Sequence, residues 1–152
     1  MPNDLSLAKK FIKKCQKTQN LYLDLGDCGI EDLNELPELF ECTNLQTLNL
    51  STNWPEKKEN VWEWSDSKNN GDSNSFKTIP PEIKQLKKLK KLIVCSDNET
   101  LPLEHAEAIT SLTCLEELYI SSPFITDFSF LGKLTELKTL YLNSNLIISR
   151  RE

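Results

Sequence analysis

Few residues in this sequence of 152 have the types and spacing that catalysis requires. The one histidine is His105, and the five cysteines include no Cys-x-x-Cys pair, so the spacing of a zinc site is missing. The sequence also lacks a glycine-rich phosphate loop and the Gly-x-Ser-x-Gly and His-Glu-x-x-His motifs. Carboxylate pairs such as Glu116 and Glu117 are abundant, but neighbours on a strand face opposite sides. We therefore expect a protein that is not an enzyme and that holds no metal and no cofactor.

The elements that would position any functional side chain follow from a nine-residue pattern that occurs five times. Its first, fourth and sixth residues are apolar in nearly every copy, and its ninth is usually Asn, Cys or Asp. The copies begin at Asn20, Leu45, Leu89, Leu115 and Leu137, which are 25, 44, 26 and 22 residues apart by subtraction. Three spacings fit a repeat of roughly 20 to 29 residues, and the longest fits one repeat with an insertion of about twenty. Because one such unit cannot bury its apolar face alone, successive units must stack into a solenoid.

Five copies in register make the chain resemble leucine-rich repeat proteins from Asn20 almost to its end. The resemblance implies an α/β solenoid, a short right-handed superhelix with a parallel β-sheet on its concave face and helices and turns on its convex face. The segment from Ala8 to Leu25, a helix that leads directly into the first repeat, also resembles the leucine-rich regions of bacterial intracellular signalling proteins. We expect a single domain, because the length suits one globular unit.

The chain divides into a cap and a repeat region. Residues 1–19 are expected to form an N-terminal capping helix, because Ser6 to Lys17 is amphipathic and a terminal repeat exposes an apolar cross-section that needs a cover. Residues 20–152 are expected to form five repeat units, with an insertion at about 54–76. No capping helix is apparent after the last repeat, so the edge from Leu137 to Ile148 is the predicted surface for self-association.

Within each repeat, alternate strand residues are expected to face opposite sides of the sheet. In the second copy this places Leu45, Leu48 and Leu50 in the interior and leaves the residues between them on the concave surface. The side-chain amide of the ninth residue, as in Asn53, is expected to bond backbone groups in the following turn. Pro123 replaces it in the fourth copy, where we expect a local irregularity because proline has no N–H.

The return segments on the convex side are expected to differ between units. Apolar residues at three-to-four spacing predict short helices over Asp32 to Cys42 and Leu103 to Leu112. The segments that begin at Ile79 and Ile125 are instead typical of tight turns. Three cysteines occupy positions where repeats pack inward and are expected to be small buried apolar groups. These are Cys28, Cys42 and Cys114.

The composition indicates a soluble protein. The formal net charge is −5 and the sequence pI is about 5.0, with 38% apolar and 27% charged residues. No apolar run approaches the roughly 20 residues that span a bilayer, and no signal peptide is recognisable, so we expect a cytoplasmic protein. The negative charge argues against nucleic-acid or membrane partners. Lysine runs over Ser6 to Lys17 and Lys84 to Lys91 keep a basic contact with nucleic acid or membrane open as an alternative.

The concave strands carry the first candidate binding surface. The third and fifth residues of the pattern point outward in every copy, so that those of successive strands should line up about 4.8 Å apart. Exposed Ile93, Tyr119 and Tyr141 would form a row with small polar neighbours, which is typical of a protein-recognition patch. The alternative is that the cross-strand tyrosines only stabilise the sheet. The candidate binding residues on this face are Tyr22, Asp24, Asn49, Lys91, Ile93, Glu117, Tyr119, Thr139 and Tyr141.

The insertion carries the second candidate surface, since it contains all three tryptophans of the chain, Trp54, Trp62 and Trp64. Long loops in compact domains are usually functional or disordered. We expect Trp62 and Trp64 to contact either the strands or a partner, and the polar stretch from Ser65 to Ser75 to remain mobile. The sequence therefore predicts a non-catalytic module that binds another protein through its concave face and this insertion, either alone or as a regulatory domain of a larger signalling protein.

Overall fold

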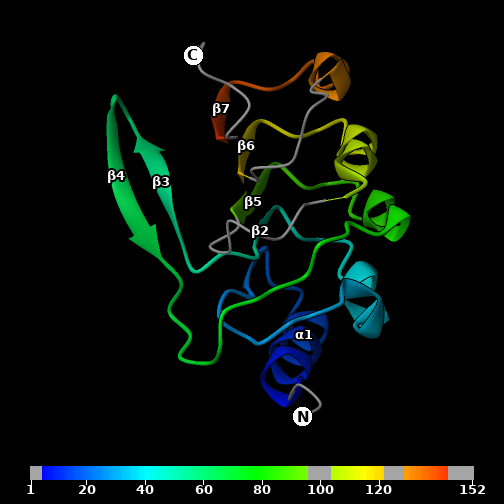
Figure 1. The fold of residues 1–152 in the computed structure, drawn as a ribbon. Helices are drawn as coiled ribbons and strands as arrows, with labels where there is room; N and C mark the ends of the chain where they lie inside the picture. The colour runs from blue at the N-terminus through cyan, green and yellow to red at the C-terminus, as the bar shows by residue number, and fades with distance from the viewer. Residues whose placement is uncertain (1–4, 96–103, 122–128, 144–152) are drawn as a thin grey trace.

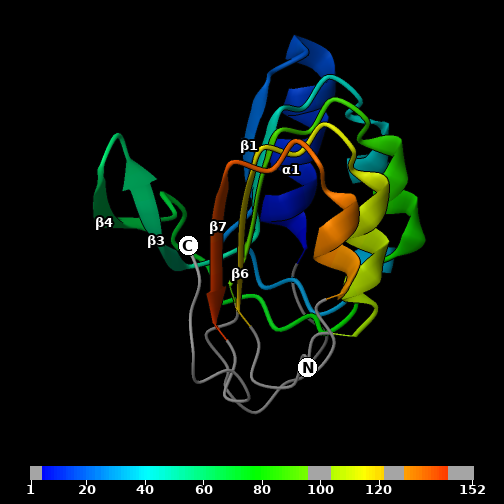
Figure 2. The same cartoon turned by 90° about the horizontal axis from the view of Figure 1, so that it is seen from above.

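A computed structural model gives the structure of residues 5–95, 104–121 and 129–143. Its main feature is a five-stranded parallel sheet with the strand order β1-β2-β5-β6-β7. The strands are β1 (Tyr22–Asp24), β2 (Thr47–Asn49), β5 (Lys91–Cys95), β6 (Glu117–Ser121) and β7 (Thr139–Asn143). They stack along one side of the molecule and short helical segments stack along the other, as Figure 1 shows from the side and Figure 2 from above. One strand comes from each copy of the nine-residue pattern, which confirms the expected α/β solenoid.

The register of the sheet follows the pattern in every copy. Leu45, Leu48 and Leu50 are 0%, 1% and 4% exposed, so the predicted inward positions are confirmed. They belong to one apolar core that lies between the sheet and the convex segments. The leucines at the fourth position of the pattern lie side by side across the strands: Leu23, Leu48, Leu92, Leu118 and Leu140.

Short 3₁₀ helices form the described part of the convex side. They are η1 (Leu33–Glu35), η2 (Pro37–Glu41), η3 (Pro81–Gln85), η4 (Ala106–Ser111) and η5 (Ser129–Lys133). A 3₁₀ helix has three residues per turn, and the buried residues Ile83, Leu86 and Leu89 follow that spacing. The helices expected within the first and third return segments are therefore present in 3₁₀ form. The two segments expected as tight turns contain the same element, because a single 3₁₀ turn is itself a tight turn.

The cysteines at the inward positions do not all behave alike. Cys28 and Cys42 are 2% and 6% exposed, as expected for small buried groups. Cys114 is exposed, so the prediction that it is buried was wrong. It lies in a turn directly before the buried Leu115, and only the second of these two neighbours points into the core.

The single α-helix of the described residues, α1 (Ser6–Thr18), lies at the end of the solenoid formed by the first repeat (Figure 1). It contacts β1 and η2. Its buried side chains are Ala8, Ile12 and Cys15, which share one helix face. The lysines of the helix point to solvent, so α1 presents an apolar side to the first repeat and a polar side to water.

The insertion forms a β-hairpin. β3 (Asn53–Lys58) and β4 (Val61–Asp66) pair in antiparallel fashion around the two-residue turn Glu59–Asn60, where Glu59 has a φ of 57°. Such a turn needs a left-handed conformation to match the twist of its strands. The hairpin stands on the concave side of the sheet, with β3 between β4 and the parallel strands (Figures 1 and 2). β3 contacts β5 and β6, so the insertion packs against the two repeats that follow it in the sequence.

The stretch from Ser65 to Ser75 is hydrogen-bonded to the first repeat, and the prediction that it is mobile was wrong. The Ser67 hydroxyl donates to the Asp24 carboxylate at 2.9 Å. Asn69 Nδ2 donates to the backbone carbonyls of Asp24 and Gly26, each at 2.9 Å. Two backbone bonds join the later part of the stretch to the turn after β1. Its polar side chains, from which we predicted mobility, instead bond to the backbone of the first repeat.

Asn74 takes the role that the pattern assigned to Asn53. Asn53 is exposed at the start of β3, because the chain leaves the repeat there. The chain returns 21 residues later, and the Asn74 side chain makes four hydrogen bonds to the backbone of the first two repeats. The partners are the N–H groups of Cys28 and Ile30 and the C=O groups of Leu25 and Leu50. One amide thus satisfies buried backbone groups of two neighbouring turns.

Two expectations concern residues outside the described ranges. They are the irregular turn at Pro123 and most of the self-association edge from Leu137 to Ile148. Within the part of the chain that the structure describes, no helix combines the length and the apolar content needed to cross a bilayer.

Candidate functional site

The sheet arranges the predicted concave residues in two columns. The third positions of the pattern give Tyr22, Thr47, Lys91, Glu117 and Thr139. The fifth positions give Asp24, Asn49, Ile93, Tyr119 and Tyr141. The prediction that these residues line up across the strands is confirmed. Their exposure, however, differs from the prediction in the middle of the face.

The hairpin covers the middle of the concave face. Trp54 of β3 packs against Ile93 and Tyr119 in an apolar cluster that is separate from the main core. Ile93 and Tyr119 are 0% exposed and Trp54 is 4% exposed. The prediction that Ile93 and Tyr119 are exposed to solvent was therefore wrong. The physical reason is that a tryptophan of the insertion removes this apolar surface from water within the chain itself.

An ion pair joins β3 to the sheet. Lys91 Nζ lies 2.5 Å from Glu56 Oε2, and both side chains are largely shielded from solvent. Trp54 Nε1 donates to the other carboxylate oxygen of Glu56 at 2.9 Å. Burial by itself would raise the pKa of Glu56, but the hydrogen bonds from Lys91 and Trp54 and the charge of Lys91 outweigh burial and hold this pKa below its usual value. The charge of Lys91, a predicted binding residue, is thus already compensated inside the molecule.

Tyr119 lies at the centre of the contact between hairpin and sheet. Its hydroxyl donates to Glu117 Oε1 at 2.8 Å and accepts from the backbone N–H of Lys57 at 3.4 Å. Lys91 Nζ lies 5.7 Å from the centroid of the Tyr119 ring, within the range of a cation–π interaction. Burial, followed by the hydrogen bond and charge of Glu117, raises the pKa of Tyr119. The hydroxyl therefore stays protonated and keeps its bond to Glu117.

Aromatic side chains continue from this covered centre out to the solvent. Trp62 of β4 lies beside Tyr119 and Tyr141, with ring centroids 6.3 and 6.4 Å apart and planes tilted by 56° and 52°. Tilted rings at such distances attract one another. Trp62 remains 45% exposed, and Val61 and Trp64 are 59% and 71% exposed. Trp62 and Trp64 are two residues apart on β4 and share one face of the hairpin, whereas Val61 lies on the other face. We call Trp62 and Trp64 the hairpin patch.

Two polar binding candidates of the first two strands, Asp24 and Asn49, form hydrogen bonds within the chain. Asn49 is fully buried, and its Nδ2 donates to Asp24 Oδ1 at 2.8 Å and to the Ser51 carbonyl at 3.0 Å. Asp24 also accepts from the Ser67 hydroxyl and from two backbone N–H groups. Buried polar groups need such partners. The prediction that Asn49 is exposed was wrong, and the half-buried Asp24 anchors the end of the insertion.

The remaining candidates keep part of their surface. Tyr22 is 48% exposed beside Leu21, which is 49% exposed. Thr139 and Tyr141 are half-buried on β7, at the opposite end of the sheet. The concave face therefore offers one partly open region at each end, with the hairpin between them, where we predicted one continuous row.

Three polar residues that position the hairpin were not predicted, namely Glu56, Asn69 and Asn74. Glu56 and Lys91 are 35 residues apart in the sequence, and no local pattern connects them. Asn69 and Asn74 belong to the polar stretch that we predicted to be mobile. A useful signal was available, because an asparagine at the end of a repeat insertion can resume the role that the interrupted pattern leaves open.

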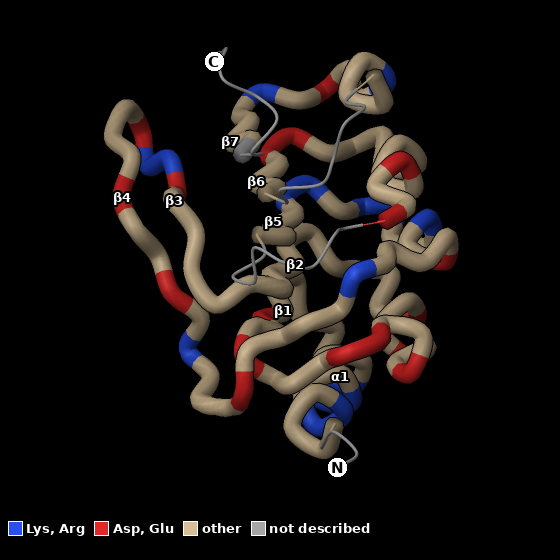
Figure 3. The backbone as a smooth tube through the Cα atoms, in the orientation of Figure 1, with Lys and Arg blue, Asp and Glu red and all other residues tan. Residues whose placement is uncertain are grey.

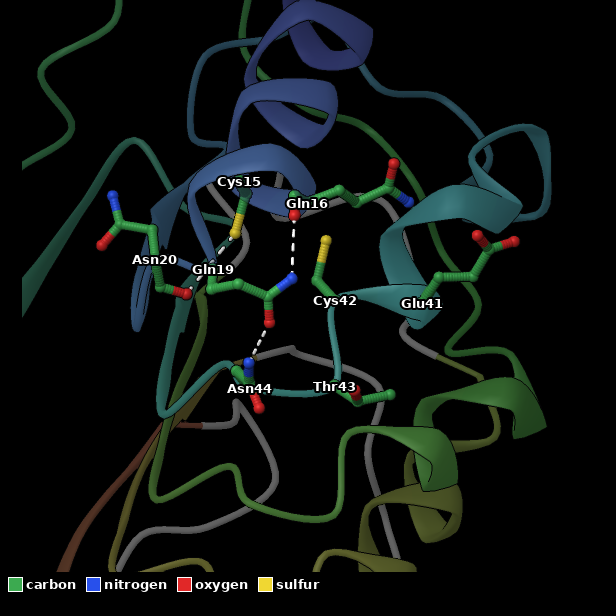
Figure 4. Close-up of a pocket in the computed structure, with 8 residues that line it drawn as sticks. All are labelled: Cys15, Gln16, Gln19, Asn20, Glu41, Cys42, Thr43 and Asn44. Atoms are coloured by element: carbon green, nitrogen blue, oxygen red, sulfur yellow. Dashed lines mark hydrogen bonds between the residues drawn. The ribbon is translucent and has the colours of Figure 1, made fainter.

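A shallow pocket of about 220 Å³ lies beside the end of α1 (Figure 4). It is lined by Cys15, Gln16, Gln19, Asn20, Glu41, Cys42, Thr43 and Asn44. Burial raises the pKa of the Cys15 thiol and raises that of Cys42 to about 12, so both sulfurs are protonated and weakly nucleophilic. Gln19 Oε1 accepts a hydrogen bond from Asn44 Nδ2. The pocket brings together no acid and base pair, and among the described residues no group of three or more His, Cys, Asp or Glu could hold a metal ion.

Positive charge gathers on α1, as Figure 3 shows, whereas the charged residues of η1 and η2 are all acidic and the later convex segments and the hairpin carry both signs. The lysines exposed on α1 are Lys9, Lys10, Lys13, Lys14 and Lys17. In the second lysine run, from Lys84 to Lys91, the last lysine is half-buried and paired with Glu56. The described surface thus has two basic regions, the lysines of α1 and the exposed Lys84, Lys87, Lys88 and Lys90. The first of them lies at the opposite end of the sheet from the hairpin patch (Figure 1).

No protein-family model matches the sequence, and no curated protein matches it. Among solved structures, an internalin of Listeria monocytogenes aligns over 87% of this chain and 37% of its own, with 21% sequence identity and a TM-score of 0.52. A leucine-rich repeat protein of Leptospira interrogans aligns over 94% of this chain and 36% of its own, with 26% identity and a TM-score of 0.45. The chain thus spans little more than a third of the length of either protein. The likeness to the internalin, together with the repeated strands and their register, shows that the fold is that of a leucine-rich repeat solenoid.

Proposed function

We propose that this chain is a non-catalytic module that binds another protein through the hairpin patch. The observation that supports this most is the exposure of Trp62 and Trp64 on one face of the same strand. Clustered apolar side chains of this size are unfavourable in water and mark interaction surfaces on soluble proteins. Tryptophan is also enriched among the residues that dominate binding energy.

The concave residues have a supporting role in this proposal. Ile93 and Tyr119 pack against Trp54, and the Tyr119 ring also contacts Trp62. These buried residues therefore fix the position of the hairpin patch without contacting the partner themselves. A preorganised surface loses less side-chain entropy on binding. We propose that Tyr141 and Thr139, at the margin of the patch, add contacts with the partner. Tyr22 lies at the far end of the sheet and is not part of the patch.

The proposal includes a cytoplasmic location, as expected from the sequence, and leaves the basic alternative as a competing outcome. A contact with nucleic acid or membrane would use the lysine runs of α1 and of Lys84 to Lys91, whose charge opposes the formal net charge of −5. A partner bound through lysines loses affinity steeply as salt rises, whereas one bound through tryptophans does not. Salt dependence therefore separates the two surfaces.

Affinity capture from the source cells tests the proposal with three variants. Trp64→Ala should lose the captured protein, since Trp64 is 71% exposed and supplies a large apolar contact. Trp64→Phe should retain most of it, because an aromatic ring remains. Lys13→Gln, on α1, should capture the same protein as the unmodified chain. Circular dichroism should give the same spectrum for all of them.

The proposal fails if Trp64→Ala captures the same protein as the unmodified chain. It also fails if the loss occurs only with Lys13→Gln and capture disappears in moderate salt, because that result assigns the contact to the basic face of α1.

A further inference from the structure

The outer edge of the hairpin strand β4 is not paired with any described strand. The small sheet contains only β3 and β4, and β3 is the strand next to the parallel ladder. β4 therefore has one side bonded to β3 and another side directed to solvent. An edge of this kind can accept a further strand, and proteins usually protect it with proline, charge or a covering element.

The backbone groups that point outward from β4 can be identified from the pairing. Antiparallel pairs alternate between hydrogen-bonded and non-hydrogen-bonded. The Ser67 N–H bonds to the Thr52 carbonyl at 2.8 Å, which fixes that pair as a bonded one. Counting along the ladder, Trp62 and Trp64 fall in non-bonded pairs, so their N–H and C=O groups face away from β3. A two-residue turn gives the same assignment, since the residues that flank it form a bonded pair.

The inner edge of the hairpin agrees with this alternation and is closed. Lys57, which pairs with Trp62, directs its N–H toward the sheet, where it reaches the Tyr119 hydroxyl at 3.4 Å. Pro55, which pairs with Trp64, has no N–H to offer. Of the two edges, that of β4 alone presents free donors and acceptors on alternate residues.

The side chains of β4 define what a paired strand would have to contain. Trp62 and Trp64 share one face of the hairpin, and Glu63 lies between them on the other face. Glu63 is directly opposite Glu56, and like charges in this position are unfavourable. The charge of Glu56 is compensated by Lys91 at 2.5 Å, whereas Glu63 is exposed and has no ion pair among the described residues. A cation placed beside Glu63 would complement this charge.

We propose that the outer edge of β4 binds an extended segment of a partner protein as an antiparallel strand of apolar–basic–apolar sequence. This inference rests on the proposed function, because it specifies how the hairpin patch takes its partner. The two apolar residues lie beside Trp62 and Trp64 and exchange backbone bonds with them. The basic residue lies beside Glu63. Main-chain bonds supply the affinity and the alternating side chains supply the specificity.

A second copy of this chain fits the same edge poorly. Antiparallel self-pairing that uses the backbone groups of both Trp62 and Trp64 is centred on Glu63. It would place Glu63 of one copy opposite Glu63 of the other, beside the carboxylates of both Glu56 residues. Charge therefore favours a foreign strand with a central lysine or arginine.

A titration of the full chain, labelled with ¹⁵N, with a synthetic strand tests the proposal. The probe is the acetylated and amidated peptide Thr-Val-Lys-Val-Thr, whose central lysine would lie beside Glu63. Both valine N–H groups would point at β4 and the lysine N–H would point away. N-methylation of the valines should therefore weaken binding by about tenfold or more, because two hydrogen bonds are lost. N-methylation of the lysine should leave binding nearly unchanged, and replacing this lysine by glutamate should weaken it.

Two variants of the protein provide a matched control. Trp64→Pro removes an outward N–H without removing a hairpin bond, in the same way that Pro55 is accommodated across from it. Trp64→Val removes the same ring and keeps the N–H. We expect the peptide to shift the backbone amide signals of Trp62 and Trp64 in the unmodified chain, to shift that of Trp62 in Trp64→Val, and to lose this effect in Trp64→Pro.

The inference is overturned if these amide signals do not move, or if the valine-methylated peptide binds as well as the unmodified one. It is also overturned if sedimentation without peptide gives a dimer that Trp64→Pro abolishes and Trp64→Val does not, since the occupant would then be a second copy. These results leave the proposed function open to its own test. Loss of capture in Trp64→Ala with no peptide effect would mean that the hairpin patch binds a partner by side chains alone.

Discussion

Replacing Asn74 by alanine should destabilise the whole repeat domain. The side chain accepts from the N–H groups of Cys28 and Ile30 at 3.2 and 2.9 Å. It donates to the C=O groups of Leu25 and Leu50 at 2.8 and 3.0 Å. These four residues are at most 4% exposed, so water does not easily replace the lost partner.

The magnitude follows from the number of bonds. A hydrogen bond contributes about 1 kcal/mol net, and a buried group left without a partner costs about 1–3 kcal/mol. Four bonds set a scale of about 4 kcal/mol. Because Asn74 itself is half-buried and water can reach part of the site, we expect a loss of about 2–4 kcal/mol in the free energy of unfolding. This is a large share of the roughly 5–15 kcal/mol that stabilises a typical domain.

Urea denaturation followed by far-ultraviolet circular dichroism measures this loss. With a slope of about 2 kcal/mol per molar, the midpoint should fall by on the order of 1 M. Asn53→Ala is the matched control, because it deletes the same group from an exposed residue at the other end of the insertion. Its effect should stay within about 0.5 kcal/mol. Equal midpoints for the two variants, or a larger loss for Asn53→Ala, would refute the role that we assign to Asn74.

Three further predictions concern packing, charge and thiol reactivity. Gly26→Ala should cost about 1–3 kcal/mol in urea denaturation, since its Cβ would lie 2.2 Å from a backbone carbonyl oxygen, whereas Gly132→Ala should be nearly neutral because no atom lies within 4 Å. The pKa of Glu56 is lowered in the folded state, so its ion pair stabilises the fold above the usual glutamate pKa of about 4.3 and loses this effect as pH falls through the lower folded value. The stability difference between the unmodified chain and Glu56→Gln should therefore be present at neutral pH and vanish in acid; a difference that grows in acid would contradict this sign. Burial raises the pKa of Cys28 to about 12, so iodoacetamide at pH 8 should alkylate the exposed Cys114 first and spare Cys28 until the chain is denatured, as peptide mass spectrometry can verify.

The repeat pattern accounts for how much of the fold was predictable. Apolar residues at the fourth and sixth positions of each copy define the inward face by simple alternation, and the same register in every copy aligns the strands. The sequence could therefore place Leu48 in the core and Tyr119 beside Tyr141 before any coordinates were known. The nine-residue pattern is local and occurs five times, so a departure in one copy, such as Asn20 at the first position, leaves the register of the other copies unchanged.

What occupies the concave face was decided only by the tertiary structure. Trp54 covers Tyr119 and Glu56 pairs with Lys91, and the two residues of each contact are at least 35 positions apart in the sequence. The insertion occurs once, so no repetition reveals its register, and its asparagines have the composition of a solvent-exposed turn. The sequence by itself determined which side chains point away from the core. Only the folded chain determined which of them reach solvent, because burial depends on what packs above a residue as well as on the direction in which it points.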